Sequence, residues 1–240
     1  MDWSDEGIIL SARPHGETAA VAEIFTRAHG RHLGLVYGGR SRRIRPVLQI
    51  GNHVDLRWKA RLADHLGHFA LELRHGYAAE LMEDAFALNG LQSLTALARL
   101  LPERDPHPSL YEITLFVLGY MGDNSVWPAL MVRWELALIA ELGFALDLDT
   151  CAASGSTQEL IYVSPKSGRA VSRAAGEAYK DKLLGLPEFL RMPGATVTAS
   201  DVGAGLALTG YFLESRVLKP HDMKLPEPRA RLIAALASAR

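Results

Sequence analysis

Short apolar stretches with the alternation of β-strands fill the first 76 residues, and turn signals separate them. The clearest stretch runs from His53 to Trp58, where polar and apolar side chains alternate strictly. This period places one face of a strand in a core and the other in solvent. Strands are expected at residues 7–13, 18–26, 33–37, 53–58 and 66–73, with a further short stretch at 47–50.

After Gly76 the apolar residues recur every three or four positions, as they do in helices. Ser109 is the expected N-cap of the second helix, and Gly143 the expected end of the third. A hairpin is expected near Tyr162 and Ala170, inside an irregular insert at about 147–171. Helices are expected at residues 81–101, 109–121, 125 or 128 to 142, 174–184, 200–217 and 227–239.

These patterns predict an α+β fold class. Five or six short strands broken by glycine turns are typical of a small barrel, and the OB-fold fits this size. We therefore expect an N-terminal OB-fold β-barrel at residues 1–76, followed by an all-helical C-terminal domain at residues 77–240. The open face of an OB-fold binds oligonucleotides in many proteins.

Positive charge gathers in one part of the predicted barrel. Between Arg27 and Arg61 there are nine basic side chains and one acidic one, whereas the whole chain has 26 basic and 27 acidic residues. A basic, strand-rich face is typical of a nucleic-acid groove, so the near-zero total does not argue against DNA binding. The predicted DNA-binding residues are Arg27, Arg31, Arg40, Arg42, Arg43, Arg45, Arg57, Lys59 and Arg61.

Four of these arginines lie within six positions of a loop that begins with two glycines, at residues 38–46. Arginines without a carboxylate nearby must face water or an anion, and a flexible loop could lay them along a phosphate backbone. A solvated loop that only aids solubility is the alternative. Tyr37 and Trp58 could stack on bases or belong to the core.

Motifs for enzymatic chemistry are missing from the sequence, which has neither a G-x-x-x-x-G-K-[ST] loop nor a G-x-S-x-G elbow. Cys151 is the one cysteine, and His65 and His68 would point to opposite faces of a strand. We therefore expect no catalytic residue, no metal and no cofactor. Asp147 and Asp149 leave a metal-dependent nuclease as an alternative, although a turn with Asx capping explains them as well.

The composition favours a cytoplasmic protein. A free thiol suits a reducing compartment, and the N-terminal residues lack the basic and apolar regions of a signal peptide. The longest apolar run, at residues 129–144, is interrupted by Arg133, Glu135 and Glu141. That run is therefore predicted to be a core helix rather than a membrane span.

Arg133 lies within the most apolar predicted helix. It could form a buried or half-buried pair with an acidic residue of segment 77–161, which holds 3 basic and 12 acidic residues. It could instead anchor an acidic peptide that lies in an apolar groove. The sequence leaves both interpretations open.

Several short patches, which keep their order and spacing over nearly the whole chain, carry a family resemblance. The N-terminal patches are Ile8 to Arg13, Glu17-Thr18, Phe25-Thr26, His29-Gly30-Arg31 and Gly38-Gly39-Arg40-Ser41. The later patches are Arg133-Trp134-Glu135-Leu136-Ala137-Leu138, Leu142-Gly143-Phe144, Leu146-Asp147-Leu148-Asp149, Cys151-Ala152, Gly155 and Tyr162 to Val171. Together they resemble the bacterial recombinational-repair mediator family RecO.

The resemblance implies an OB-fold followed by a helical domain, with binding of single- and double-stranded DNA and no enzymatic turnover. It implies annealing of complementary strands and, together with RecR, loading of the RecA recombinase onto strands coated by single-strand-binding protein. Arg133 falls on a position that resembles a contact for the acidic C-terminal tail of that protein. The implied location is the cytoplasm, in association with the nucleoid.

Many members of the family carry a four-cysteine zinc finger in the helical domain. This chain departs from that pattern, because Cys151 fits the first ligand, Ser154 replaces the second and no later cysteine exists. The insert at 147–171 is therefore expected to be a zinc-finger remnant without zinc. An RNA-binding OB-fold module remains the other alternative function.

Overall fold

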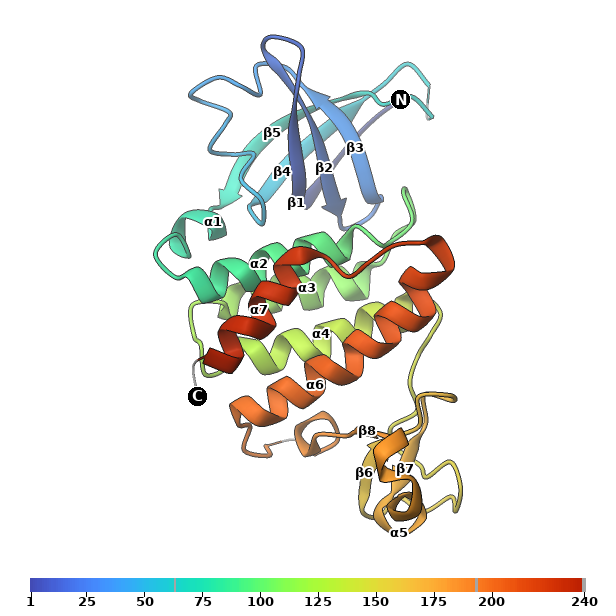
Figure 1. The fold of residues 1–240 in the computed structure, drawn as a ribbon. Coiled ribbons are helices and arrows are strands. Elements are labelled where there is room, and N and C mark those ends of the chain that lie inside the picture. The colour runs from blue at the N-terminus through green and yellow to red at the C-terminus, as the bar shows by residue number, and fades with distance from the viewer. Residues whose placement is uncertain (63, 193, 239–240) are drawn as a thin grey trace. The chain divides into compact units, whose positions relative to one another are not determined.

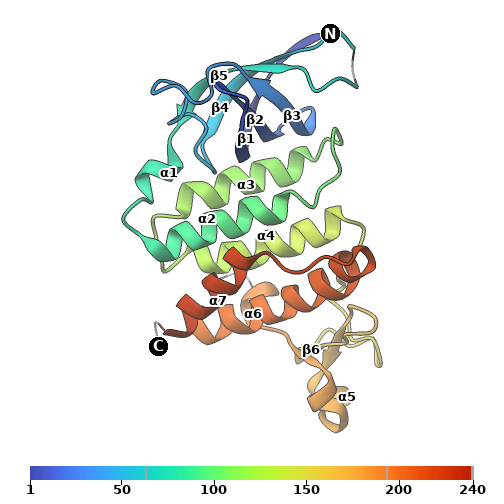
Figure 2. The same cartoon turned by 45° about the horizontal axis from the view of Figure 1, so that its top comes forward.

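A computed structural model of the chain describes residues 1–62, 64–192 and 194–238 (Figures 1 and 2). The chain divides into two compact units, Met1–Asn124 and Ser125–Arg240. The first unit contains all five strands of the barrel together with α1, α2 and α3. The domain boundary that we predicted near Gly76 follows the last barrel strand, and it stays a prediction.

The five N-terminal strands form a closed barrel in the order β1-β2-β3-β5-β4. β1 pairs with both β2 and β4, which closes the barrel, and β3 meets β5 in a parallel pairing of Leu35 with His68. This five-stranded arrangement confirms the predicted OB-fold. The strands are β1 (Asp2–His15), β2 (Ala19–Thr26), β3 (Gly30–Val36), β4 (His53–Lys59) and β5 (His68–His75).

Alternation along β4 builds the barrel interior, as the sequence predicted. Val54, Leu56 and Trp58 are buried, whereas Asp55 and Arg57 between them are exposed. The buried side chains meet apolar residues from the other strands, and burial of apolar area is the main source of barrel stability. The core comprises Ile9, Ala20, Ala22, Ile24, Val36, Leu48, Val54, Leu56, Trp58 and Phe69.

The segment that joins β3 to β4 differs from the prediction. Residues 38–52 form successive turns, rather than a flexible loop followed by a short strand. The N–H of Arg45 donates to the carbonyl of Ser41 at 3.0 Å, and that of Leu48 to the carbonyl of Ile44 at 3.2 Å. Ile44, Val47 and Leu48 pack against the barrel core. Their helical spacing turns one side of the segment inward, so Arg42, Arg43 and Arg45 on the other side are exposed.

Two longer helices complete the first unit after the short helix α1 (Tyr77–Glu80). They are α2 (Ala85–Ala98) and α3 (Pro108–Tyr120), close to the predicted ranges. The prediction of Ser109 as a cap was wrong, because Pro108 already occupies the first turn of α3. Proline suits that position because its missing N–H would have no partner there.

The second unit is built on helices. Gly143 ends the first of them with φ at +88°, which confirms the predicted stop. The predicted helix at 200–217 continues into a π-helical turn, and the one at 174–184 is instead a short helix followed by a 3-10 helix. Residue 239 of the last predicted helix lies outside the described residues. The helices are α4 (Trp127–Glu141), α5 (Arg173–Gly176), η1 (Glu177–Lys182), η2 (Glu188–Leu190), α6 (Ala199–Phe212), η3 (Leu213–Leu218), η4 (Lys219–His221) and α7 (Glu227–Ser238).

A fully buried ion pair connects α4, α6 and α7. The Nε and Nη2 atoms of Arg229, on one edge of the guanidinium, donate to the two oxygens of the Glu135 carboxylate, each at 2.8 Å. The side chains are 3 % and 0 % exposed. Thr209 donates its hydroxyl to the same carboxylate, and Arg229 also donates to the carbonyl of Leu206 at 2.6 Å. Both carboxylate oxygens of Glu135 and the Nε and Nη2 atoms of Arg229 therefore have partners, as buried charges require.

A small three-stranded sheet begins in the predicted insert at 147–171 and takes its third strand from beyond it. β6 (Leu160–Val163) pairs antiparallel with β7 (Ala170–Ser172) and with β8 (Leu184–Gly185), which confirms the predicted hairpin. Across the part of the chain that the structure describes, no helix is both long and apolar enough to cross a membrane.

Candidate nucleic-acid interface

The nine cations predicted to bind DNA all lie in the first unit, but three of them have carboxylate partners there. An arginine that is already paired must give up its partner to bind a phosphate. These three are therefore the weaker candidates. The pairs are Arg27 with Glu6 and Glu112, Arg31 with Glu23 and Glu103, and Arg57 with Asp2.

The other six predicted cations are exposed and, among the described residues, have no carboxylate within 4 Å. Arg40 donates to the backbone carbonyls of Gly16 and Glu17 at 3.2 and 2.9 Å, which fixes its side chain without neutralising it. An exposed cation without an internal partner can bind an external anion at little cost. We call this set the open cations: Arg40, Arg42, Arg43, Arg45, Lys59 and Arg61.

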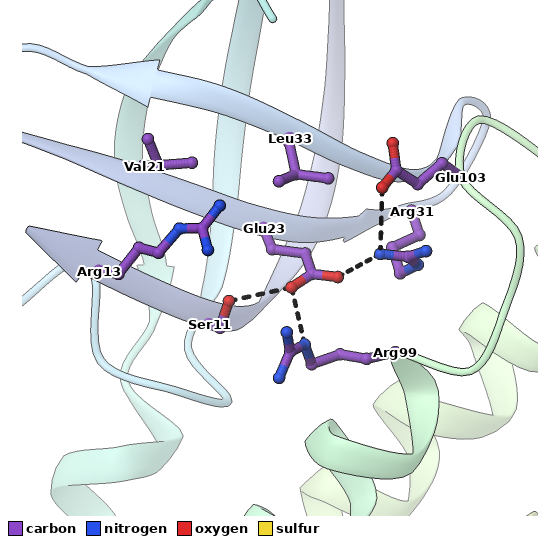
Figure 3. A pocket seen from close by; sticks show the side chains of 8 residues that line it. All are labelled: Ser11, Arg13, Val21, Glu23, Arg31, Leu33, Arg99 and Glu103. Carbon is purple, nitrogen blue, oxygen red and sulfur yellow. Dashed lines mark hydrogen bonds and ion pairs between the residues drawn. The ribbon is translucent and has the colours of Figure 1, made fainter. Parts of the chain in front are cut away.

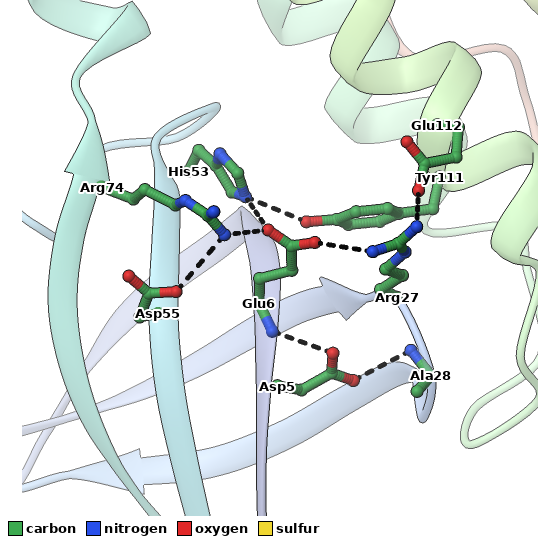
Figure 4. Close-up of polar contacts among 9 residues, drawn as sticks. All are labelled: Asp5, Glu6, Arg27, Ala28, His53, Asp55, Arg74, Tyr111 and Glu112. Carbon is green, nitrogen blue, oxygen red and sulfur yellow. Dashed lines mark hydrogen bonds and ion pairs between the residues drawn. The ribbon is translucent and has the colours of Figure 1, made fainter.

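Arg27 belongs instead to an internal polar cluster around Glu6 (Figure 4). Arg27 and Arg74 both donate to the Glu6 carboxylate, and the Nε2 atom of His53 lies 3.2 Å from it. The hydroxyl of Tyr111 lies 3.1 Å from the same nitrogen. Burial lowers the pKa of His53 and raises the pKa of Tyr111. Through Tyr111 and the Arg27–Glu112 pair, the cluster connects α3 to the barrel. Its cations already surround the Glu6 carboxylate, so the cluster leaves no open site for an external anion.

A second internal cluster explains the position of Arg31 (Figure 3). The residues of this cluster line a pocket of about 440 Å³ on the outer surface of β1, β2 and β3. Glu23, only 4 % exposed, accepts hydrogen bonds from Ser11 at 3.0 Å, from Arg99 at 2.7 Å and from Arg31. Arg13 also lines the pocket, and it has no ion pair with any described residue. Arg13 therefore adds an open positive charge at this pocket.

Arg13 extends the basic surface beyond the predicted stretch. Besides the pocket around Glu23, it lines a neighbouring pocket of about 490 Å³ together with Arg40 and Arg45. The sequence analysis missed Arg13 and Arg99, because both lie outside residues 27–61. Their proximity depends on strand pairing, which sets Arg13 opposite Val21 on β2. A predicted strand register could have revealed Arg13, but not Arg99, which comes from the end of a helix.

The two aromatic residues considered for base stacking have opposite environments. Trp58 is 1 % exposed and donates its indole N–H to the carbonyl of Leu66 at 3.1 Å, so it belongs to the core. Tyr37 is 67 % exposed and lies directly after β3. Of the two, Tyr37 alone can offer a ring face to a ligand.

Arg133 lies in α4 and is exposed, so the interpretation of a buried ion pair was wrong for this residue. It donates to the carbonyl of Phe189, and its guanidinium lies 5.9 Å from the centre of the Phe189 ring. Within the described residues no carboxylate pairs with it. The acidic residue of this helix that is buried, Glu135, pairs with Arg229 instead. The role of Arg133 in binding a partner stays a prediction.

Comparison with known proteins gives the same result at both ends of the chain. Residues 1–77 match the family model described as recombination protein O N terminal, and residues 82–225 match recombination protein O C terminal. The chain belongs to the RecO family. Its relatives match this chain over nearly the whole length of each protein.

Three such relatives carry the name DNA repair protein RecO. The protein from Methylobacterium nodulans is 56 % identical over 244 residues, covering 100 % of this chain and 99 % of the relative. The protein from Methylorubrum populi is 52 % identical over 240 residues, with 98 % of each chain covered. The protein from Mesorhizobium japonicum is 52 % identical over 237 residues, covering 98 % of this chain and 94 % of the relative.

The zinc finger of many RecO members does not fit this chain. Among the described residues, no group of three or more His, Cys, Asp and Glu side chains could hold a metal ion. Cys151 is buried and accepts a hydrogen bond from the N–H of Ser172 at 3.3 Å. The N–H of Ala152 donates to the carbonyl of Ala170 at 2.8 Å. Backbone hydrogen bonds and the small sheet thus connect the parts of the insert without a metal.

Asp147 and Asp149 form a turn rather than a paired-carboxylate site. The Asp147 carboxylate accepts from the N–H of Asp149 at 3.2 Å and from Arg169 at 3.1 Å. These hydrogen bonds, first of all the one from the Asp149 backbone, lower the pKa of Asp147. This is the Asx-capped turn that the sequence analysis gave as the alternative to a nuclease. Both oxygens of the Asp147 carboxylate therefore already accept hydrogen bonds.

Proposed function

We propose that this protein is a DNA-binding recombination mediator. It binds single- and double-stranded DNA through the barrel and anneals complementary strands. Together with RecR it helps to load RecA recombinase onto strands coated by single-strand-binding protein. The observation that carries the proposal is the set of open cations on an OB-fold barrel of the RecO family. Each cation that neutralises a phosphate releases a counterion, which drives binding at low salt.

Annealing by this route requires no covalent chemistry. Two complementary strands repel each other through their phosphates, and a surface that neutralises both lowers that barrier. In this proposal the protein binds DNA and is not an enzyme. It acts in the cytoplasm, in association with the nucleoid. The open cations read the backbone and not the bases, so annealing should be independent of sequence.

We assign the contact with single-strand-binding protein to Arg133. The tail of that protein is acidic with an apolar tip, so its receptor needs a cation beside an apolar surface. Arg133 supplies an exposed guanidinium that pairs with no carboxylate of a described residue, and the buried Phe189, through its carbonyl and ring, fixes its position. Guanidinium can bind a carboxylate through two parallel hydrogen bonds, which a lysine cannot reproduce.

The test is annealing of labelled complementary strands, either bare or coated with single-strand-binding protein, in EDTA and without nucleotide. We expect the protein to accelerate both reactions. The variant Arg42→Ala/Arg43→Ala/Arg45→Ala should be impaired on both substrates, and Arg133→Ala only on coated strands. Cleavage that appears on addition of magnesium would favour a nuclease, and tighter binding to RNA than to matched DNA would favour an RNA-binding module. Absence of both binding and annealing in the intact protein would contradict the proposal.

A further inference from the structure

Tyr37 is exposed, whereas the other aromatic residues of the barrel strands are buried or, for Trp3, half-buried. Its side chain is 67 % exposed, whereas Phe25, Trp58 and Phe69 are 3 % exposed or less. The Tyr37 ring lies 5.6 Å from the ring of His68, tilted by 52°. An exposed aromatic ring leaves apolar area in contact with water, which a flat ligand could cover.

A shallow pocket of about 400 Å³ surrounds this ring. It lies where the end of β3, the end of β4 and the start of β5 come together, since Lys59 pairs with His68 and Leu35 with the same residue. Two of the open cations, Lys59 and Arg61, form part of the wall, and His65 and His68 contribute imidazole rings. None of the described residues that line it is acidic. The pocket therefore suits a ligand with an aromatic group next to a negatively charged one.

Contacts within the first unit hold the wall of this pocket in place. The Trp58 indole donates to the carbonyl of Leu66, and Gly67 lies against the same ring. Gly67 has φ at +62°, and a Cβ atom there would be 2.5 Å from the indole, so no other residue fits. Arg104 donates to the carbonyl of His65 at 3.2 Å. A wall that is already ordered costs little entropy when a ligand binds.

We propose that Tyr37 is a base-stacking residue that makes the barrel favour single strands over duplex DNA. One unstacked base lies against the Tyr37 ring, and Lys59 and Arg61 contact the phosphates on either side of it. In a duplex each base is already stacked on its neighbours, so its face is closed to Tyr37. This inference rests on the proposed function, because it specifies how the same barrel surface binds DNA.

The geometry favours a nucleobase over an acidic peptide. Stacking on an aromatic ring works for every base, since every base has a π-face, and basic residues that follow the backbone complete such a site. Lys59 and Arg61, which are two positions apart on the chain, line the same pocket as Tyr37. That arrangement repeats the alternation of base and phosphate along a strand.

The experiment compares three labelled probes by fluorescence anisotropy at fixed salt. They are a short thymidine strand, the same strand with a series of abasic sites at its centre, and a blunt duplex. The protein is the full chain, as wild type, Tyr37→Ala and Tyr37→Phe. Tyr179→Ala serves as a matched control, since Tyr179 is also exposed, at 62 %, but lies in the second unit. Unfolding curves establish that each variant is folded.

We expect Tyr37→Ala to weaken binding of the thymidine strand by about 5- to 150-fold, the range that loss of one base-aromatic stack produces. Duplex binding and the salt slope should stay as in wild type, and Tyr37→Phe should retain most of the affinity. Wild type should lose a similar factor on the abasic strand, whereas Tyr37→Ala should lose none. The abasic strand tests the proposal without any mutation.

Equal affinity of wild type and Tyr37→Ala for the thymidine strand would overturn the inference. So would equal losses on single strand and duplex. Failure of the proposed function is distinct from these outcomes, because wild type would then bind none of the three DNA probes.

Discussion

Arginine has opposite roles in the barrel and in the helical unit. In the segment between β3 and β4, Arg42, Arg43 and Arg45 are exposed, without a carboxylate partner among the described residues. In the second unit Arg229 is buried and donates two parallel hydrogen bonds to Glu135. The comparison teaches that the partners of a cation, and not its identity, decide whether it serves stability or binding.

The physical reason is solvation. An exposed guanidinium keeps its water until an external anion replaces it, so its removal changes binding and leaves the folded state almost unaffected. A buried guanidinium has given up its water for Glu135, Leu206 and Thr209. Removing it leaves an uncompensated carboxylate in the interior, which is far more costly than the loss of the pair itself.

The largest effect is expected at the buried pair. Arg229→Ala should lower the free energy of unfolding by about 3–5 kcal/mol, measured by urea denaturation. Arg231→Ala is the matched control in the same helix, because its pair with Glu227 is exposed, and it should cost less than about 1 kcal/mol. Replacing both partners, as Glu135→Leu with Arg229→Met, should recover much of the loss. Equal stability of the two single variants would break the comparison.

The next effect concerns the exposed arginines. Arg42→Ala/Arg43→Ala/Arg45→Ala should weaken duplex binding and lower the slope of log affinity against log salt by about 0.9 for each lost phosphate contact. The unfolding free energy should change by no more than about 0.5 kcal/mol at each position. Arg57→Ala is the control from the same barrel, since Arg57 already pairs with Asp2, and its slope should change less. An unchanged slope in the triple variant would remove these residues from the interface.

A smaller set of experiments applies the comparison to Arg133, an exposed arginine of the helical unit. Arg133→Ala should weaken binding of the acidic tail peptide at least about tenfold, and Arg133→Lys should restore only part of it. Annealing of bare strands should be unaffected. Arg173→Ala is a control from the same unit, because Arg173 is exposed and pairs with Glu159. Normal peptide binding by Arg133→Ala would place the receptor elsewhere.

The smallest effect is expected at Asp84, a charge whose partners are two backbone N–H groups and the side chain of Asn124. Its carboxylate accepts from the N–H of Phe86 and of Ala87 at 2.9 and 3.0 Å and so caps α2. The hydrogen bond from Ala87, followed by that from Asn124, lowers the pKa of Asp84 below 3.8. Asp84→Ala should cost about 1 kcal/mol at neutral pH.

The pH dependence of that difference follows from the direction of the shift. The ionised carboxylate is favoured in the folded state, so its contribution is complete above pH 3.8 and disappears as the pH falls through the lower folded pKa. Urea denaturation of wild type and Asp84→Ala should therefore converge in acid. A difference that stays constant down to the lowest pH at which the protein folds would show that the capping charge contributes nothing.

Local patterns were enough to predict much of this protein. The alternation along His53 to Trp58 predicted a strand with one face in the core, and glycine at position 143 predicted the end of a helix. The run of basic residues predicted where open cations lie. Each of these signals is carried by neighbours in sequence, because strand alternation and helix caps depend on two to four consecutive residues.

The partners of the charges were decided only by the tertiary structure. Glu135 and Arg229 are 94 positions apart, and Glu23 and Arg99 are 76 apart. No local pattern distinguishes Arg31, held by Glu23, from Arg43, which faces outward. The sequence by itself determined which elements form and where positive charge accumulates. Folding determined which charges remain open to a ligand, because ion pairing depends on distance in space and not on distance along the chain.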